Sequence, residues 1–494
     1  MANVFGTDNS EILDKADGAT ENPDIILGLG GNDDLFGFGG NDTLKGGGGA
    51  DDLFGGAGSD WTDYSDSPVG VHVFLSSGFG ELRTAEGVTY SSIENVWGSA
   101  YDDFLRGTLG ANQLVGAAGS DVLDGSLGTD HLDGGDGYDF AHYANSAEGV
   151  LVSLLSNGGL GGDAEGDTFT SIEAVFGSLY DDIISGDHGD NNLFGESGDD
   201  RLIGNNGHDG LLGGLGADRM EGGAGNDDYF VDNNLDVVVE AAGNGSDTVY
   251  SEITLPSLAD NVKTLWLTGM ANINGTGNAL PNLLRGNDGN NQLDGGGGVD
   301  AMFGGLGSDI YVVNNANETA MEYGGEGSDE VRTSVSYTLT AGSDVETLRT
   351  TNDNGVTAIN LTGNSSGNTV RGNNGSNILN GRGGTDTLWG YDGPDVFLFT
   401  AAPNAGVATL MDFDLAEGDS IRLYSASFPL GPVVDSSEFV IGAAAQDAND
   451  NLIYNSGNGQ LLWDVDGTGP VAAIHFANLP INLMLSYDDF SVMM

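Results

Sequence analysis

The chain lacks cysteine and has little positive charge. No Cys occurs among its 494 residues, which excludes disulfide bonds and thiolate metal sites. Only 13 Lys and Arg residues stand against 75 Asp and Glu residues, so the formal net charge is −62. A chain this acidic repels phosphate, and we expect no nucleic-acid partner. It also repels itself, so folding requires a counter-charge.

The chain also lacks the apolar segments that membrane insertion or a cleaved export signal needs. It contains no run of about 18 apolar residues, so we expect no transmembrane segment. Residues 1–11 have neither the basic region nor the apolar stretch of a secretory signal peptide. These two features alone would indicate a cytosolic protein, whereas the repeats and the C-terminal region indicate a different location.

Glycine, by contrast, is abundant and occurs in a pattern. The chain has 85 Gly residues, many of them within a nine-residue phrase, Gly-Gly-x-Gly-x-Asp-x-Leu-x, of which residues 46–54 are a clean copy. The glycines permit a tight turn with positive φ, and the Asp supplies a hard oxygen ligand. The Leu two residues later is typical of a three-residue strand with one inward side chain. The phrase therefore predicts a repeated turn and strand with a metal ligand in the turn.

The copies form five clusters, and the sixth position of each copy holds the candidate metal ligand. The clusters span residues 28–63, 98–142, 177–230, 277–312 and 363–398. The predicted ligands are Asp33, Asp42, Asp51, Asp60, Asp103, Asp121, Asp130, Asp139, Asp182, Asp200, Asp209, Asp218, Asp227, Asp300, Asp309, Asp386 and Asp395. Six further copies carry Asn at this position: Asn112, Asn191, Asn282, Asn291, Asn368 and Asn377. Asn keeps an oxygen but loses the charge, so these turns should bind metal more weakly.

The nonapeptide resembles the calcium-binding repeat of RTX proteins. The resemblance implies that two nonapeptides make one coil of a right-handed parallel β-roll, with multiple Ca2+ ions held between the turns of successive coils. Such a coil would advance about 4.8 Å, the spacing between neighbouring strands. Because Ca2+ takes six to eight oxygen ligands and the side chains of one turn supply too few, adjacent turns must share each ion. Folding should therefore depend on calcium.

A longer duplication lies on top of the nonapeptides. Residues 60–106 align with residues 139–185 at a constant offset of 79 residues. A different insert joins the third, fourth and fifth clusters, because segments within residues 227–249 resemble segments within residues 309–331. Alternating stretches such as residues 71–75 predict half-buried strands inside the inserts. Repeats at such periods indicate a solenoid rather than one globular core.

The predicted fold class is all-β, with tandem right-handed parallel β-roll segments, strand-rich inserts and a C-terminal β cap. The predicted segments are residues 1–63 (N-terminal segment and first cluster), 64–142, 143–230, 231–312 and 313–398 (each an insert followed by a cluster) and 399–494 (cap and secretion region).

The C-terminal region, from about residue 396 to residue 494, has less glycine and more aromatic and aliphatic residues. It resembles the C-terminal target region of RTX proteins that type I secretion systems export. Asp489-Phe490, followed by Ser491-Val492-Met493-Met494, resembles the ending of that uncleaved signal. The resemblance implies a type I exporter as partner and a secreted, extracellular location. The same region would also cap the solenoid, and the two roles are compatible.

Catalytic motifs are missing or explained by the repeats. The chain has no His-Glu-x-x-His, and its six His residues are scattered. Residues 363–367 match Gly-x-Ser-x-Gly, but they lie in a repeat turn without strand-to-helix context. Acid pairs such as Asp102-Asp103 are in phase with the turns. We therefore predict that the chain is not an enzyme.

These observations favour a secreted protein that stays unfolded where free calcium is scarce and folds outside the cell. A structural, surface or matrix role is the preferred function, with self-assembly or a cell-surface partner. Two alternatives stay open: a secreted RTX enzyme or toxin with its activity in the inserts, and a soluble calcium buffer.

Overall fold

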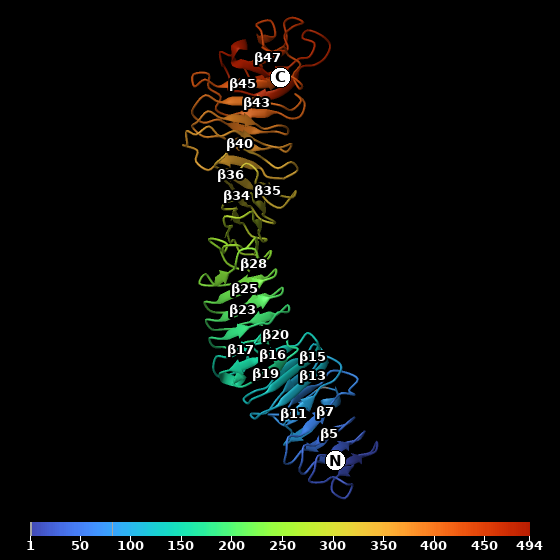
Figure 1. The fold of residues 1–494 in the computed structure, drawn as a ribbon. Helices are drawn as coiled ribbons and strands as arrows, with labels where there is room; N and C mark the ends of the chain where they lie inside the picture. The colour runs from blue at the N-terminus through green and yellow to red at the C-terminus, as the bar shows by residue number, and fades with distance from the viewer. Residues whose placement is uncertain (1, 82) are drawn as a thin grey trace. The chain divides into compact units, whose positions relative to one another are not determined.

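The computed structural model describes residues 2–81 and 83–494, and the regular structure in this part of the chain is almost entirely short β-strands. Three single-turn 3-10 helices accompany the strands: η1 (Arg83–Ala85), η2 (Gly162–Ala164) and η3 (Tyr487–Asp489). Two compact units form, one from Met1–Tyr250 with Ala259–Asn261 and the other from Ser251–Leu258 with Val262–Met494. In each unit the short strands of successive coils stack on one another (Figure 1).

The first cluster shows how the nonapeptides coil. One strand arises from each of the four copies: β4 (Asp34–Phe36), β5 (Thr43–Lys45), β6 (Asp52–Phe54) and β7 (Trp61–Asp63). The strand β3 (Ile25–Leu27) lies directly before the first copy. β3, β5 and β7 pair in parallel in one sheet, while β4 and β6 pair in parallel in the other. In this register Leu35 lies beside Leu53, 18 residues further on. The prediction of two nonapeptides per coil and of a parallel β-solenoid is confirmed.

The remaining strands of the first unit continue the same two stacks. One side contains β1 (Asn3–Phe5), β3, β5, β7, β11 (Asn95–Trp97), β13 (Gln113–Gly119), β15 (His131–Gly137) and β19 (Thr168–Thr170), followed by β18 (Gly158–Leu160), β17 (Leu151–Ser153), β21 (Ile183–Ser185), β23 (Arg201–Asn206), β25 (Arg219–Ala224) and β27 (Val237–Val239). The other side contains β2 (Ile12–Leu13), β4, β6, β10 (Thr89–Ser91), β9 (Phe79–Glu81), β8 (His72–Phe74), β12 (Phe104–Arg106), β14 (Val122–Asp124), β16 (Phe140–His142), β20 (Ala174–Phe176), β22 (Asn192–Phe194), β24 (Gly210–Leu212) and β26 (Asp228–Val231).

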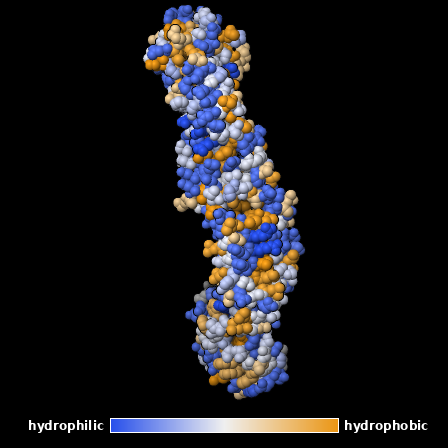
Figure 2. Space-filling model, turned by 90° about the vertical axis from the view of Figure 1, so that its left-hand side faces the viewer, coloured by the Kyte–Doolittle hydropathy of each residue, from blue (hydrophilic) through white to orange (hydrophobic). Residues whose placement is uncertain are grey.

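The core is a column of aliphatic side chains between the two sheets. In most three-residue strands the middle residue is buried and its neighbours are more exposed, as in β4 and β5. Leu35, Leu44, Leu105 and Leu193 are all fully buried. Each such Leu contributes about 2 kcal/mol through burial, so the eighth position of the phrase supplies most of the core. On the outward face, apolar residues are dispersed among hydrophilic ones (Figure 2).

The duplicated inserts are extra strands of the roll. In the first insert, β9 pairs antiparallel with both β8 and β10, and these flanking strands pair in parallel with β12 and β6. In the second insert, β17 pairs antiparallel with β18 and in parallel with β21. This insert lies in the sheet opposite to that of the first insert. Six single strands, β11 to β16, separate the two inserts. Because the chain alternates between the two sheets from β10 to β17, this number places the two inserts on opposite sheets. The predicted strand-rich inserts are confirmed.

The second unit contains three ladders. The first comprises β30 (Gly275–Thr276), β32 (Gln292–Asp294), β34 (Ile310–Val313), β36 (Glu330–Thr333), β38 (Thr347–Thr350), β40 (Thr369–Arg371), β42 (Thr387–Trp389), β44 (Ala408–Leu410), β49 (Ile474–Asn478), β48 (Gln460–Trp463), β47 (Leu452–Asn455) and β46 (Phe439–Ile441). The second comprises β29 (Thr264–Leu267), β31 (Leu283–Arg285), β33 (Ala301–Phe303) and β35 (Thr319–Met321). The third comprises β37 (Tyr337–Thr338), β39 (Leu361–Thr362), β41 (Ile378–Asn380), β43 (Val396–Phe399), β45 (Ser420–Tyr424) and β50 (Phe490–Met493).

The C-terminal region is a β cap built onto the last coils. Antiparallel strands β47, β48 and β49 extend one ladder, and their core includes Phe428, whose ring lies 5.4 Å from that of Trp463 and 5.0 Å from that of Phe476. The terminal strand β50 pairs in parallel with β45, and Phe490 is buried. The predicted cap is thus confirmed as a fold. None of the helices described has the length and apolar character of a membrane span.

The roll begins earlier than the nonapeptides predict. The sequence places the start of stacking at Asp33, in the first clean copy. In the structure, β1 already pairs with β3, and the Glu11 backbone N–H donates to Asp33 Oδ1 at 2.8 Å. Asp33 therefore has a coil on both sides, and the prediction that it lies at the edge is wrong. The residues before Gly28 form a coil without the glycine phrase that would mark it.

Candidate metal sites

The predicted Asp ligands all lie inside the turns that connect the strands. All seventeen side chains are buried, and the most exposed of them, Asp386, is only 4% exposed. Each one directly precedes a strand and lies five residues after the glycine that begins its turn, so the coil pitch stacks them in columns. The sequence pattern therefore identified positions that the fold brings into register.

One oxygen of each stacked carboxylate holds neighbouring coils together. The backbone N–H of Asp33 donates to Oδ1 of Asp51 at 2.9 Å, and that of Asp200 donates to Oδ1 of Asp218 at 2.8 Å. The same bond from an Asn copy runs from Asn191 to Asp209 at 2.8 Å. A charge-assisted bond of this kind between coils ties each turn to the next.

The second oxygen of most of these carboxylates is buried without a hydrogen-bond partner. This holds for Oδ2 of Asp33, Asp42, Asp51, Asp60, Asp121, Asp130, Asp139, Asp200, Asp209, Asp218, Asp227, Asp300, Asp309 and Asp395. A buried, unpaired carboxylate oxygen costs several kcal/mol unless a cation binds it, so its regular recurrence indicates a cation site.

A backbone carbonyl converges on the same place. A β-carbon on Gly37, the first residue of its copy, would lie 2.5 Å from both Asp42 Oδ2 and the Gly55 carbonyl oxygen of the next coil. Only glycine leaves room there. Carboxylate and carbonyl oxygens are the ligands that Ca2+ prefers in proteins, so the donor set fits this ion. When bound, Ca2+ would supply the positive charge that these oxygens lack.

Burial perturbs the acidity of the turn carboxylates. Desolvation, followed by the charges of Asp103 and Asp139, raises the pKa of Asp121 to about 7. Desolvation, followed by the charge of Asp167, raises the pKa of Asp130 to about 8. Desolvation, opposed by a backbone hydrogen bond and reinforced by the charge of Asp419, raises the pKa of Asp395 to about 8. In the folded state without a cation, these groups therefore take up a proton near neutral pH rather than near pH 4.

Without calcium, acidification should therefore promote folding. A carboxyl whose pKa is raised on folding binds more protons in the folded state between its two pKa values, so the free energy of unfolding rises as the pH falls. Each additional bound proton contributes a slope of about 1.4 kcal/mol per pH unit. Circular dichroism in calcium-depleted buffer should show strand signal increasing from pH 8 to pH 5. A signal that falls on acidification in this range would contradict the expectation.

The Asn copies satisfy their side chains without a cation. Oδ1 of Asn112 accepts the Thr108 backbone N–H at 2.8 Å, and Oδ1 of Asn377 accepts that of Asn373 at 2.8 Å. The side-chain amides donate to backbone carbonyls, as from Asn377 to Ile359 at 2.8 Å. These turns close through hydrogen bonds, in keeping with the weaker metal binding that the sequence predicts for them.

Two of the predicted Asp ligands resemble the Asn copies. Asp103 and Asp182 accept, at Oδ2, the backbone N–H groups of Ser99 and Ser178. Both Ser hydroxyls also donate to Oδ1 of the same carboxylates, at 2.8 and 2.9 Å. Oδ2 of these two residues thus has a partner already, unlike Oδ2 of the fourteen Asp residues named above. A Ser four residues before the Asp is the sequence signal for this difference.

Several acidic residues outside the predicted set continue the columns. They accept the backbone N–H of the preceding column member: Asp167 (from Asp130), Asp236 (from Asp218), Asp247 (from Asp227), Asp329 (from Asp309) and Asp419 (from Asp395). Asp236 follows Asp218 by 18 residues, so its spacing could have revealed it. The others follow after 20 to 37 residues, and only folding reveals them.

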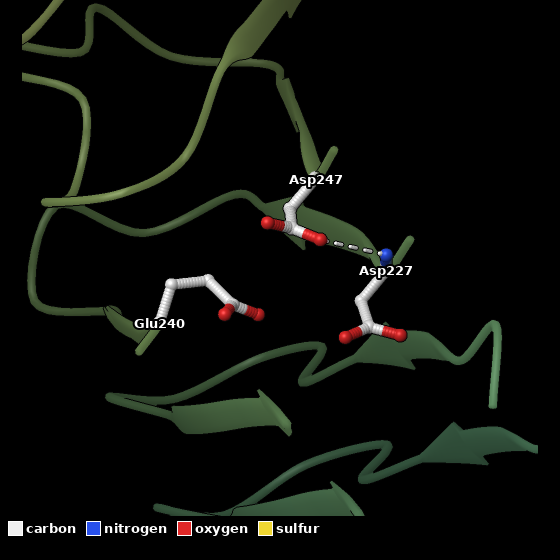
Figure 3. Close-up of side chains that lie close together, drawn as sticks. All are labelled: Asp227, Glu240 and Asp247. Atoms are coloured by element: carbon white, nitrogen blue, oxygen red, sulfur yellow. Dashed lines mark hydrogen bonds between the residues drawn. The ribbon is translucent and has the colours of Figure 1, made fainter. Parts of the chain in front are cut away.

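Two groups of three buried acids arise where such residues meet a Glu. Asp227, Glu240 and Asp247 each offer an oxygen within 4.8 Å of the others. Figure 3 shows these three side chains around a common space. The second group consists of Asp309, Glu322 and Asp329. Sequence reasoning included the first Asp of each group and missed the other two acids.

Loss of one interior ligand should weaken calcium-dependent folding. Asp209 accepts a bond from Asn191, donates one to Asp227 and carries a buried, unpaired Oδ2. Asp209→Ala should raise the calcium concentration at the folding midpoint several-fold, and Asp209→Asn should raise it less because one oxygen remains. The measurement is a calcium titration followed by circular dichroism. Asp260→Ala, at an exposed Asp, is the control and should leave the midpoint unchanged.

A parallel β-solenoid with stacked acidic turns defines a class of protein, the metal-binding repeat solenoids. Comparison with protein families then identifies the repeat. The RTX calcium-binding nonapeptide repeat matches residues 27–61, 90–123, 106–141, 176–211, 194–229, 203–238, 276–311 and 362–397. The chain therefore carries RTX calcium-binding nonapeptide repeats over these residues, and the repeats imply that it binds Ca2+. No curated protein matches the chain in sequence.

Proposed function

We propose that the chain is a secreted, non-enzymatic protein of the cell surface or extracellular matrix, whose rolls fold when they bind calcium outside the cell. The observation that carries the proposal is the column of buried carboxylates with unpaired Oδ2 atoms. Such a column is unfavourable until cations neutralise it, so folding follows the calcium concentration. Extracellular calcium modules work at about 10⁻⁴–10⁻³ M, a range that separates the outside of a cell from its interior.

The acidic residues that might suggest catalysis have structural partners in the turns. Asp102 Oδ1 accepts the Ser120 backbone N–H at 2.8 Å, and Asp181 Oδ1 accepts that of Asp199 at 2.9 Å. In the Gly-x-Ser-x-Gly match, Asn364 Oδ1 accepts the Ser366 backbone N–H at 2.9 Å. These contacts explain the residues as turn formers and support a structural role.

The state of assembly of the protein in calcium distinguishes the proposed surface or matrix role from the two alternative functions. The protein should be compared with and without millimolar calcium by electron microscopy and sedimentation. Ordered polymer, or binding to the surface of the producing cells, supports the surface or matrix role. A monodisperse protein that only binds calcium favours the buffer, and an activity that appears on calcium loading favours the enzyme or toxin.

Export should require the C-terminal region. Removing about the last fifty residues should reduce secretion through a type I exporter by at least about tenfold, because the segment that resembles the export signal is lost. The measurement is the amount of full-length and truncated protein in the medium of cells that carry the exporter. Circular dichroism of the purified truncated chain is the control, and its repeats should still respond to calcium. Secretion of the truncated chain at the full-length level would show that this region acts only as a cap of the solenoid.

A further inference from the structure

The third and fourth clusters end differently from their interior coils. Within the third cluster, the Gly222 carbonyl approaches the turn of Asp209, since a β-carbon on Gly204 would lie 2.5 Å from it. One coil later, 18 residues after Gly222, the corresponding position holds Glu240 instead of glycine. Glu322 likewise follows Gly304 by 18 residues. A longer, charged side chain thus replaces a glycine at the end of each array.

The Glu side chain points back toward the last glycine-containing turn of the array. A β-carbon on Gly304 would lie 2.4 Å from Glu322 Oε1 and 2.2 Å from Asp309 Oδ2, so these two oxygens flank the same glycine. Asp329 completes the group, with Oδ1 2.8 Å from the Asp309 backbone nitrogen. Among the described residues, only this group and that of Asp227 bring together three side chains of metal-binding type in this way.

Both groups are buried and contain oxygens without a partner. Asp227 and Glu322 are 0% exposed, and Asp309 is 1% exposed. Oδ2 of Asp227, Oδ2 of Asp309 and Oε2 of Glu322 have no hydrogen-bond partner. Three carboxylates confined within 4.8 Å repel one another strongly in a buried site. A cation bound between them attracts all three, so the net electrostatic energy of the site becomes favourable.

A tyrosine orients the Glu in each group. Tyr229 occupies the inward strand position that holds Leu in most copies; its hydroxyl accepts the Gly222 backbone N–H at 2.8 Å and donates to Glu240 Oε1. Tyr311 does the same between Gly304, at 2.7 Å, and Glu322. The Tyr, the Glu and both Asp residues recur at one offset of 82 residues, so the chain carries two copies of one arrangement.

We propose that Asp227, Glu240 and Asp247 form a terminal calcium site, that Asp309, Glu322 and Asp329 form a second, and that each holds its Ca2+ more tightly than the turns between nonapeptides do. Three carboxylates without His or Cys suit a hard cation, and the number of charged ligands tunes calcium affinity. Because Glu and the second Asp come from the segment after the array, each ion ties that segment to the last coil. The proposal is independent of the secretion and surface role proposed above.

Calcium exchange in the folded protein tests the proposal. The full-length chain is loaded with ⁴⁵Ca²⁺ at a saturating concentration and chased with excess unlabelled Ca2+, so that the rolls stay folded throughout. Because tighter binding mostly reflects slower dissociation, two ions per chain should exchange at least about tenfold more slowly than the others. Exchange of all bound ions at one rate would overturn the proposal. A chain that binds no calcium would instead refute calcium-dependent folding itself.

Charge-removing variants assign the slow ions to their sites. Glu240→Gln and Glu322→Gln preserve side-chain size, so each should abolish one slowly exchanging ion, and the double variant should abolish both. Glu252→Gln, at an exposed Glu, is the matched control and should keep both. Retention of both slow ions in the double variant would overturn the assignment. Circular dichroism in saturating calcium checks folding, and if one variant does not fold, the other variant and the wild-type exchange curve decide.

Discussion

Removing calcium is expected to abolish most of the β-strand circular dichroism signal of this protein. Fourteen Asp side chains in the turns carry a buried Oδ2 without a partner, and the chain has a formal net charge of −62. Without cations these charges repel one another, and the many glycines favour the unfolded chain entropically. The signal should return on adding calcium in the high micromolar to millimolar range. A fully folded spectrum in chelator would contradict this expectation.

Magnesium should not replace calcium in this experiment. The turns offer carboxylate and carbonyl oxygens from flexible glycine-rich backbone, as at Gly37 and Asp42. Mg2+ demands near-octahedral geometry and retains its water ligands, whereas Ca2+ accepts irregular sets of six to eight oxygens. The control is a titration with MgCl2 at matched ionic strength, which should restore less than about a tenth of the signal that calcium restores.

Substituting Gly49 by Ala should strongly destabilise the first roll. Gly49 has φ of 142°, and a β-carbon there would lie 1.5 Å from the Gly31 carbonyl oxygen of the preceding coil. The backbone of two coils would have to separate, at a cost of more than about 3 kcal/mol. Denaturant unfolding in saturating calcium measures this loss.

The neighbouring residue of the same turn provides a matched control. A β-carbon on Gly48 would have only one heavy atom within reach, the Leu29 carbonyl oxygen at 4.0 Å. Gly48→Ala should therefore change the free energy of unfolding by less than about 1 kcal/mol. Equal effects of the two substitutions would show that coil spacing at this turn is adjustable.

The regular part of the candidate sites was predictable because one period governs all of its components. A turn of nine residues places the Asp, the inward Leu and the first glycine at constant offsets, and two turns per coil bring each Asp beside the Asp 18 residues later. Leu35 beside Leu53 and Asp33 bonded to Asp51 show both consequences of this period. No long-range information beyond the repeat was needed.

Prediction failed where the period is interrupted. The coil before Gly28 contains β1 and β2 but none of the glycine phrase, so its start could not be recognised from the pattern. Asp247 joins the column 20 residues after Asp227 rather than 18, which removes it from the expected register. Glu240 lies in register but at a glycine position, where no ligand was expected.

The sequence by itself therefore determined the parallel β-roll, the aliphatic column and the seventeen turn carboxylates, because these depend on local spacing alone. Only the tertiary structure decided that the two duplicated inserts enter opposite sheets, because the sheet depends on how many strands separate them. It also decided which carboxylates already have partners, as Asp103 does through Ser99, and which stay unpaired. Finally, it placed Glu240 and Asp247 beside Asp227, because chain segments outside the repeat meet the roll only after it has coiled.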